Sequence, residues 1–215
     1  MRQSFLPGRH IRPASYIALA CRSDSSCIST YLDRDVRRLS AGIDDLKFLG
    51  FLRAAAARAG QQVNYKGIAD DAEIDQATAK NWLHILEALG IVFLLRPYSN
   101  NVLKRTVSTP KLCFYDTGLV CYLTRWSSPE TAMNGAMNGA LLENYTVAEI
   151  VKTYQNAGQE PFLYYHRDKD AREIDVLMEQ DGKLFPIEIK KMAAPPKKLT
   201  KVFELIGKSL SQNKG

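Results

Sequence analysis

A stretch of twenty residues, REIDVLMEQDGKLFPIEIKK (172–191), constrains the fold of this chain more than any other feature. Apolar and charged residues alternate on both sides of QDG, and an Asp-Gly pair between two alternating runs is a strong signal for a β-hairpin. The stretch predicts two antiparallel strands, at 173–179 and 183–191. An earlier apolar run predicts a third strand at 162–166, preceded by a helix at 140–155.

The charged face of this hairpin predicts a site for a cation. Strict alternation places Asp175 on the face opposite Val176, and it places Glu188 and Lys190 on the face opposite Ile187. Asp175 and Glu188 then lie on neighbouring strands and share one face. Two carboxylates a few ångströms apart repel each other, and a divalent cation removes that cost.

Magnesium suits such a face, because it prefers oxygen ligands and binds one or two carboxylates together with waters and phosphate oxygens. We expect Glu143, Asp175 and Glu188 to be metal ligands, with Glu143 contributed by the preceding helix. Lys190 is the expected catalytic residue, which orients a water or offsets negative charge in a phosphorane-like transition state. The alternative is a solvated strand face on which cross-strand ion pairs add a little stability.

A resemblance supports the first interpretation. Asp175, followed after twelve residues by Glu188, Ile189 and Lys190, is similar to the D-x(n)-E-x-K core of the restriction-endonuclease-like nucleases. The resemblance implies an αβββαβ core in which the matching Asp and Glu bind magnesium, the Lys assists catalysis and a helical Glu completes the site. The proline that often precedes the Asp is replaced by Ile174.

The sequence NYKGIADDAEIDQATAKNWLHILEALGIVFLL (64–95) predicts a short helix, a turn, a longer helix and a buried strand. Asn64 and Asp75 are the expected helix caps, and Gly90 is the expected stop. Asp44 is the expected cap of an earlier helix that begins at DLKFLGFLR. This order is typical of a winged helix-turn-helix. The residues expected to contact nucleic acid are Gln76, Thr78, Lys80, Asn81, Lys104 and Arg105. Acidic residues at 70–75 favour the alternative, a module that docks a protein.

Further segments extend the resemblance. TYLDRDVRRLS, NWLHILEALGIVFLLRPY, KRTVSTPKLCFYDTGLVCYL, GALLENY, YYHRDKDAREIDVLME and FPIEIKK together resemble the C-terminal half of a bacterial and archaeal family of predicted AAA-type ATPases with an appended domain of unknown function. The resemblance implies a P-loop ATPase, then a winged-helix segment, then the nuclease-like domain.

This chain departs from that family at both ends. It contains no G-x-x-x-x-G-K-[ST] motif, because the GKS at 207–209 has Val202 in place of the first glycine and lies in a helical pattern. ATP is therefore not expected to bind. We also expect the last strand of the nuclease core to be missing, so the chain is predicted to be a truncated gene product or a fragment.

The predicted class is α/β: a helical, winged-helix-like segment followed by a restriction-endonuclease-like αβββ domain. The expected layout is an irregular N-terminus (1–30), the helical segment (31–127), a linker (128–139) and the nuclease-like domain (140–215). The net charge of +6 is compatible with a polyanionic partner. No apolar run has the length of a membrane span, and we expect a cytoplasmic protein.

Two functions remain open from the sequence. One is a magnesium-dependent phosphodiesterase that acts on nucleic acid. The other is a non-catalytic module that binds nucleic acid, an ATPase domain or another protein.

Overall fold

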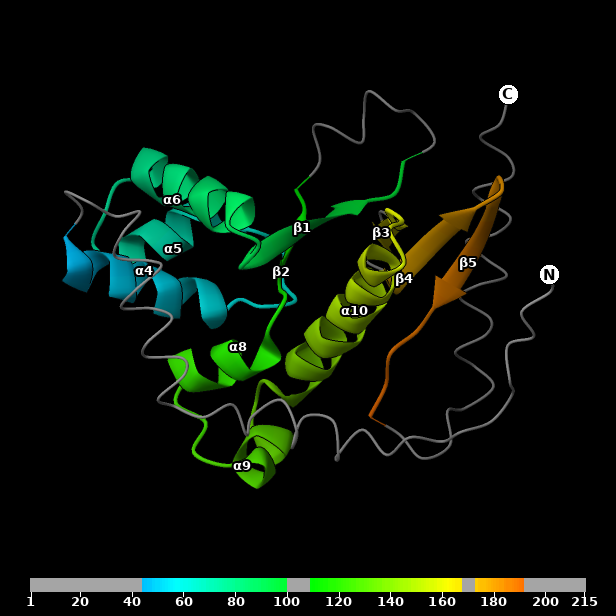
Figure 1. Cartoon of the computed structure of the whole chain (residues 1–215). Coiled ribbons are helices and arrows are strands. Elements are labelled where there is room, and N and C mark those ends of the chain that lie inside the picture. Colours follow the sequence, from blue (N-terminus) through cyan, green and yellow to red (C-terminus); the bar gives the residue numbers. More distant parts are fainter. Residues whose placement is uncertain (1–43, 100–108, 168–172, 192–215) are drawn as a thin grey trace.

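The computed structural model describes residues 44–99, 109–167 and 173–191, and it has an α/β fold with helices packed on a five-stranded mixed sheet (Figure 1). The strand order is β2-β1-β3-β4-β5. In chain order the elements are α4 (Asp45–Ala56), α5 (Tyr65–Asp71), α6 (Gln76–Ala88), β1 (Val92–Pro97), β2 (Lys111–Phe114), α8 (Thr117–Leu123), α9 (Pro129–Asn134), α10 (Asn138–Asn156), β3 (Phe162–Arg167), β4 (Glu173–Gln180) and β5 (Lys183–Ile187).

The helical part begins as the sequence predicts. Asp44, Asn64 and Asp75 are the N-caps of α4, α5 and α6, and each side chain accepts a hydrogen bond from a backbone N–H in the first turn of its helix. Gly90 follows α6 with a φ of +67°, a conformation that glycine adopts without steric cost. The order α4, α5, α6 and the antiparallel pair β1–β2 is that of a winged helix-turn-helix.

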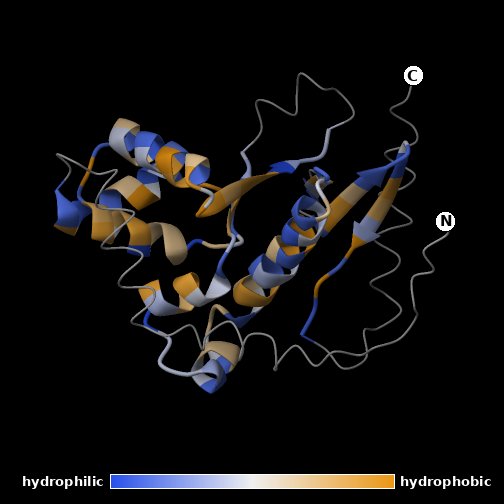
Figure 2. Ribbon diagram, in the orientation of Figure 1, coloured by the Kyte–Doolittle hydropathy of each residue, from blue (hydrophilic) through white to orange (hydrophobic). Residues whose placement is uncertain are grey.

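Two cores lie on opposite faces of the sheet. Helices α4, α5, α6 and α8 cover one face of β1 and β2, where Phe51 packs edge-on against Trp82. Helix α10 covers the other face, with Val147 and Val151 against Tyr165 and Val176. β1 separates the two cores and is hydrophobic along most of its length (Figure 2).

The sheet continues from the helical part into the hairpin part. β1 pairs with β3 in parallel, and β4 then pairs with β3 and β5 antiparallel. The hairpin between β4 and β5 turns at Asp181 and Gly182, whose φ angles of 52° and 71° are those of a type I′ turn. The predicted hairpin at QDG is confirmed.

The segment expected to be a linker, 128–139, is helical in the structure. It contains α9 and the start of α10, and Ser128 and Thr131 form a capping box at the start of α9. Ala132 is fully buried in the first core. Gly135 lies so close to the Trp126 ring that an added Cβ would clash with it, so Ala132 and Gly135 serve close packing in this segment.

Several predictions fall outside the described residues. These are the irregular N-terminus, Lys104 and Arg105 of the wing, the C-terminal helix with its GKS sequence, and the final strand of the nuclease core. Within the described ranges, no helix is both long and apolar enough to cross a membrane.

Asn144 joins α10 to the end of β2. It is buried, its Oδ1 accepts a hydrogen bond from the Phe114 N–H at 2.7 Å, and its Nδ2 donates to the Phe114 carbonyl at 3.0 Å and to Thr117 Oγ1. A buried backbone group without a partner is costly, so this side chain fixes how α10 sits against the helical part.

Replacing Asn144 with alanine leaves the N–H and the carbonyl of Phe114 without partners. We expect Asn144→Ala to lower the free energy of unfolding by about 2–4 kcal/mol, measured by urea denaturation. The matched control is Asn156→Ala at the exposed end of α10, which we expect to change stability by less than about 0.5 kcal/mol. Equal effects of the two substitutions would contradict the structural role of Asn144.

Candidate functional site

Three carboxylates meet where α10 crosses β4. Glu143 comes from α10, and Glu173 and Asp175 come from β4. One oxygen from each of the three lies within 4.8 Å of the other two. Carboxylate oxygens at such a spacing form the kind of ligand set that hard divalent cations bind.

An irregularity in β4 creates this arrangement. Tyr164 pairs with Leu177, whereas His166 pairs with Ile174, so the register between β3 and β4 shifts by one residue. One residue of β3 therefore faces two residues of β4, which is the definition of a β-bulge.

The two bulged residues are Asp175 and Val176, and both stand opposite Tyr165. Tyr165 packs in the core under α10, so Val176 and, beyond the bulge, Glu173 also belong to the α10 face. The strict alternation predicted from the sequence is wrong at this point, because it placed Asp175 and Val176 on different faces of the strand. The bulge brings the β4 carboxylates to the side from which Glu143 projects.

A buried lysine lies inside the cluster. Lys111, the first residue of β2, is only 4% exposed. Its Nζ lies 2.5 Å from Glu143 Oε1, forms an ion pair with Glu173 Oε1, and stands 5.2 Å from the centre of the Tyr165 ring. Sequence reasoning missed both Lys111 and Glu173.

The environment changes the protonation of these groups. Burial raises the pKa of Glu143; Lys111 offsets part of this effect, while Asp175 and Glu173 add to it. Burial opposes the charge on Lys111, but Glu143 and Glu173 outweigh it and raise the pKa of the ammonium. Lys111 is therefore a cation at neutral pH, and it neutralises acidic groups that have been removed from water.

A second lysine, Lys190, forms an ion pair with the Asp175 carboxylate. Its Nζ lies 2.7 Å from Glu188 Oε1 and 3.5 Å from Asp175 Oδ2. Burial opposes its charge, but Glu188 and Asp175 together raise the pKa of Lys190. The Lys190 ammonium therefore bridges the carboxylates of Asp175 and Glu188. Among the described residues, the group of three neighbouring carboxylate oxygens does not include Glu188.

β5 ends earlier than the sequence predicts, at Ile187 instead of 191. The N–H of Ile189 donates to Asp175 Oδ2 at 2.7 Å, so a side chain takes the role that a neighbouring backbone carbonyl has in a regular ladder. This bond places Glu188 and Lys190 beside the cluster.

The structure brings together Glu143, Asp175 and Lys190 of the expected site, and it adds Glu173. The signal that could have identified Glu173 is the adjacent apolar pair Val176-Leu177, which breaks the alternation expected of a half-exposed strand. In the structure both residues are buried. Lys111 carries no comparable signal, because its role depends on a contact with Glu143, which lies 32 residues later in the sequence.

Asp175→Ala removes the acceptor of the Ile189 N–H. Hydrogen bonds to charged groups contribute about 1.5–3 kcal/mol, so we expect the Ile189 amide to exchange with solvent roughly 10- to 100-fold faster. Amide hydrogen exchange followed by NMR measures this rate. Asp181→Asn, in the hairpin turn of the same sheet, should leave it unchanged, and an unaltered Ile189 rate in Asp175→Ala would contradict the assigned bond.

Comparisons with known proteins place this chain in a family. A model described as a domain of unknown function, DUF8612, matches residues 14–130, more than half of the chain. The chain belongs to the DUF8612 family. A second model, described as a domain of unknown function, DUF4143, matches residues 138–215.

Similar curated proteins are longer and have no described function. Uncharacterized proteins of Mycobacterium bovis and Mycobacterium tuberculosis are each 26% identical to this chain over 168 residues, which is 78% of the chain and 37% of either relative. The chain therefore spans about a third of the length of the curated relatives it matches. No solved structure matches it significantly.

The two matched segments both contribute to the site. Lys111 lies in the DUF8612 segment, and the residues around it, Glu143, Glu173 and Asp175, lie in the DUF4143 segment. The boundary between the segments falls at 131–137, within the helical region that the sequence predicted as a linker.

The expected nucleic-acid-binding residues of the DUF8612 segment occupy different environments. Gln76, Lys80 and Asn81 are exposed on α6. Thr78 is not free to read a base, because its N–H and its hydroxyl both donate to the Asp75 carboxylate.

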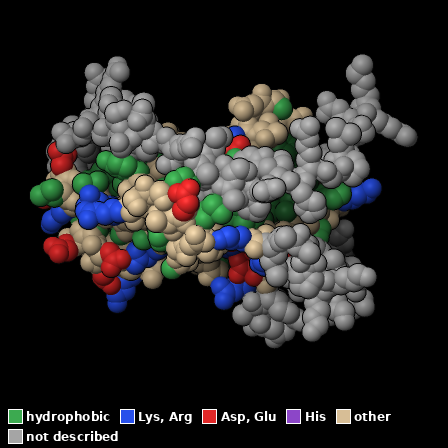
Figure 3. All heavy atoms as spheres, turned by 90° about the horizontal axis from the view of Figure 1, so that it is seen from below, with side chains coloured by type: hydrophobic (Ala, Val, Ile, Leu, Met, Phe, Trp, Pro, Cys, Tyr) green, Lys and Arg blue, Asp and Glu red, His purple; other side chains and the backbone are tan. Residues whose placement is uncertain are grey.

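The start of α6 is acidic. A hollow of about 700 Å³ there is lined by Asp44, Glu73 and Asp75 together with Lys47 and Trp82. Helix-turn-helix proteins contact bases with the N-terminal part of this helix, and carboxylates at that position repel phosphates. Figure 3 shows basic and acidic side chains interspersed on the face it presents, without a single-sign stripe among the described residues.

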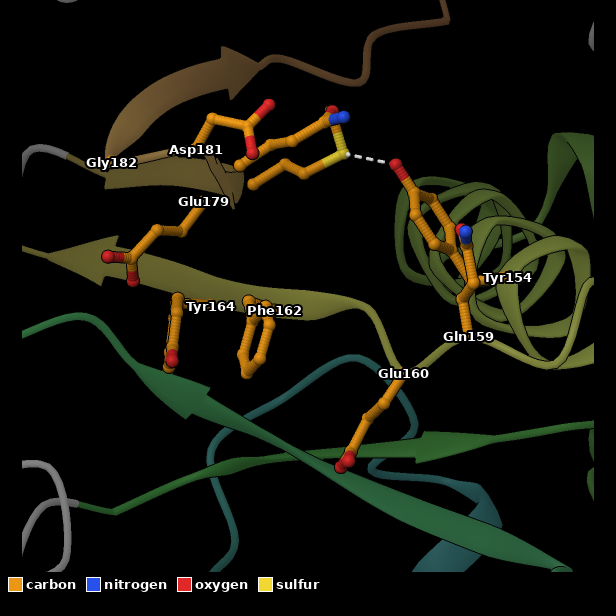
Figure 4. A pocket seen from close by; sticks show the side chains of 10 residues that line it. Tyr154, Gln159, Glu160, Phe162, Tyr164, Glu179, Asp181 and Gly182 are labelled. Carbon is orange, nitrogen blue, oxygen red and sulfur yellow. Dashed lines mark hydrogen bonds between the residues drawn. The ribbon is translucent and has the colours of Figure 1, made fainter.

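A second hollow, of about 660 Å³, lies in the DUF4143 segment at the hairpin end of the sheet. Phe162 and Tyr164 of β3 project side by side, and Tyr154 of α10 contacts the Met178 sulfur (Figure 4). None of the clustered carboxylates lines this hollow, so it is separate from the candidate metal site.

Proposed function

We propose that this chain carries a magnesium-dependent phosphodiesterase site that acts on nucleic acid. The observation that supports the proposal is the convergence of Glu143, Glu173 and Asp175 from α10 and β4, with Lys190 held beside them. The resemblance of Asp175 and Glu188-Ile189-Lys190 to the D-x(n)-E-x-K core points to the same chemistry.

The donor set fits a hard divalent cation. Magnesium binds oxygens at about 2.0–2.1 Å, so two oxygens on one ion are separated by up to about 4.2 Å. Neighbouring oxygens on an octahedral ion are only about 2.9 Å apart, so side-chain rotations that bring oxygens of the 4.8 Å group closer by about 1–2 Å are needed for all three to bind one ion. Glu143 and Glu173 already share one cation, the Lys111 ammonium, which shows that this position favours positive charge.

We assign the carboxylates of Glu143, Glu173 and Asp175 as the metal-holding groups, and Glu188 as the residue that positions Lys190. Bound magnesium would supply Lewis-acid stabilisation of a phosphoryl group and a more acidic water. Lys190, with its raised pKa, acts as a cation and hydrogen-bond donor and not as a general base. Its charge offsets the negative charge that develops on the phosphate during substitution.

The wider context is also a proposal. In the family that the sequence resembles, the winged-helix and nuclease-like parts follow an AAA-type ATPase, and the longer curated relatives are compatible with such an arrangement. We propose that this chain corresponds to the C-terminal part of such a protein and works with an ATPase domain.

The test is cleavage of labelled DNA and RNA in the presence of magnesium or manganese. We expect cleavage that EDTA abolishes, and a rate at least about 100-fold lower in Lys190→Ala and Asp175→Asn, because the first removes the cation beside the phosphate and the second removes a carboxylate that holds the metal. Lys183→Ala, an exposed lysine of β5, is the matched control and should cleave at the wild-type rate. Cleavage that survives Asp175→Asn would refute the proposed site.

A non-catalytic binding module is the second candidate. The observation that favours it is the acidic hollow at the start of α6, which suits a basic segment of a protein partner better than a phosphate backbone.

Binding of duplex DNA, followed by fluorescence anisotropy at several salt concentrations, separates the two types of partner. If α6 contacts the duplex, Lys80→Ala should weaken binding and reduce the salt slope by about 1, whereas Lys66→Ala on α5 should change neither. No measurable affinity for DNA or RNA at low salt would favour a protein partner.

A further inference from the structure

Lys111 occupies the place that a divalent cation needs. Its Nζ contacts Glu143 Oε1 and Glu173 Oε1, which are donors from two of the three clustered carboxylates. A metal ion on the same oxygens would stand no more than about 4.6 Å from the ammonium nitrogen, because Nζ lies 2.5 Å from Glu143 Oε1 and the ion would lie about 2.1 Å from that oxygen. The two positive charges would repel each other.

The position of Lys111 is fixed by its strand. β2 pairs with β1 along its length, and Leu112 and Phe114 are fully buried. On the other side of β2, Lys111 forms an isolated antiparallel β-bridge with Gln62. The Lys111 Nζ lies over the Tyr165 ring, 5.2 Å from its centre, and the Tyr165 hydroxyl donates to the Thr109 carbonyl and accepts from Gln62 Nε2. The ammonium is thus delivered by a packed strand and not by a mobile surface side chain.

We infer that Lys111 is an internal counter-ion that competes with divalent metal for the carboxylate cluster. This inference rests on the proposed function, because it treats the cluster as the metal site. Lys111 offsets part of the negative charge of the cluster when no metal is bound, and its ammonium must move off Glu143 and Glu173 before metal can bind both.

Through Lys111, the DUF8612 segment regulates metal binding by the DUF4143 segment. Lys111 is the side chain through which the first segment enters the cluster of the second. A rotation of the Lys111 side chain away from Glu143 and Glu173 would withdraw the ammonium and raise the affinity for metal, without any change in the carboxylates themselves.

The test compares manganese binding by the wild-type chain and four variants, using the electron paramagnetic resonance signal of free Mn²⁺. Lys111→Met and Lys111→Gln remove the ammonium, and Lys111→Arg keeps a cation. Lys152→Met is the matched control, since Lys152 is on α10 and pairs with Glu149 away from the cluster. We expect both neutral variants to bind Mn²⁺ roughly 10- to 100-fold more tightly than wild type, and the other two to resemble wild type.

Thermal unfolding with and without Mn²⁺ gives a second readout. Without metal, the neutral variants leave like charges buried together, so their midpoint temperatures should fall, and Mn²⁺ should raise them by more than it raises that of wild type. Folding of these variants only in the presence of Mn²⁺ would support the inference. Failure to fold under both conditions would overturn it, because a divalent cation would then be unable to replace the ammonium.

The remaining outcomes separate this inference from the proposed function. Equal Mn²⁺ affinity in wild type and Lys111→Met, or weaker binding in the variant, would overturn competition by Lys111 while leaving the metal site in place. No Mn²⁺ binding by any of the five proteins would remove the metal site and with it both proposals.

Discussion

Carboxylates can be brought together inside a protein only if something neutralises them, and the junction between α10 and β4 depends on that requirement. Glu143 is held on the α10 face of the sheet, where burial raises its pKa, and the Lys111 ammonium is what keeps it beside Glu173. An ion pair of this kind does not add much to stability when compared with apolar residues of the same volume. Loss of either partner would nevertheless leave a buried charge without its counter-ion, so the junction depends on the pair being complete.

The helical part and the hairpin could be predicted because their signals are local. The caps Asp44, Asn64 and Asp75 and the turn at Asp181-Gly182 each act over three or four residues, and the structure shows all of them. Alternation along β4 failed where a single extra residue reverses the faces, because a bulge depends on how two strands pair and not on the sequence of one. Lys111 could not be predicted for the same reason: nothing in KLCF indicates which helix will cross the strand.

The two matched segments form one folded unit in the structure. β1 belongs to the first segment and β3 to the second, yet they are neighbours in the same sheet. The apparent linker contributes Ala132 to the core, and Gly60 of the first segment lies so close to Ala140 that an added Cβ would stand 3.2 Å from the Ala140 carbonyl. The boundary between the families is therefore a boundary in sequence comparison and not a hinge between independent bodies.

Helix α10 takes part in both cores. Leu141 and Leu142 pack with the helical part, whereas Val147 and Val151 pack against the hairpin sheet, and Glu143 lies between these two groups. Since packed interiors transmit small displacements, a volume change at either end of the helix would translate or rotate it and alter the spacing between Glu143 and Asp175. The spacing of the carboxylates therefore depends on how α10 packs at both of its ends. Substitutions at apolar positions in either core would change how strongly the carboxylates hold a cation.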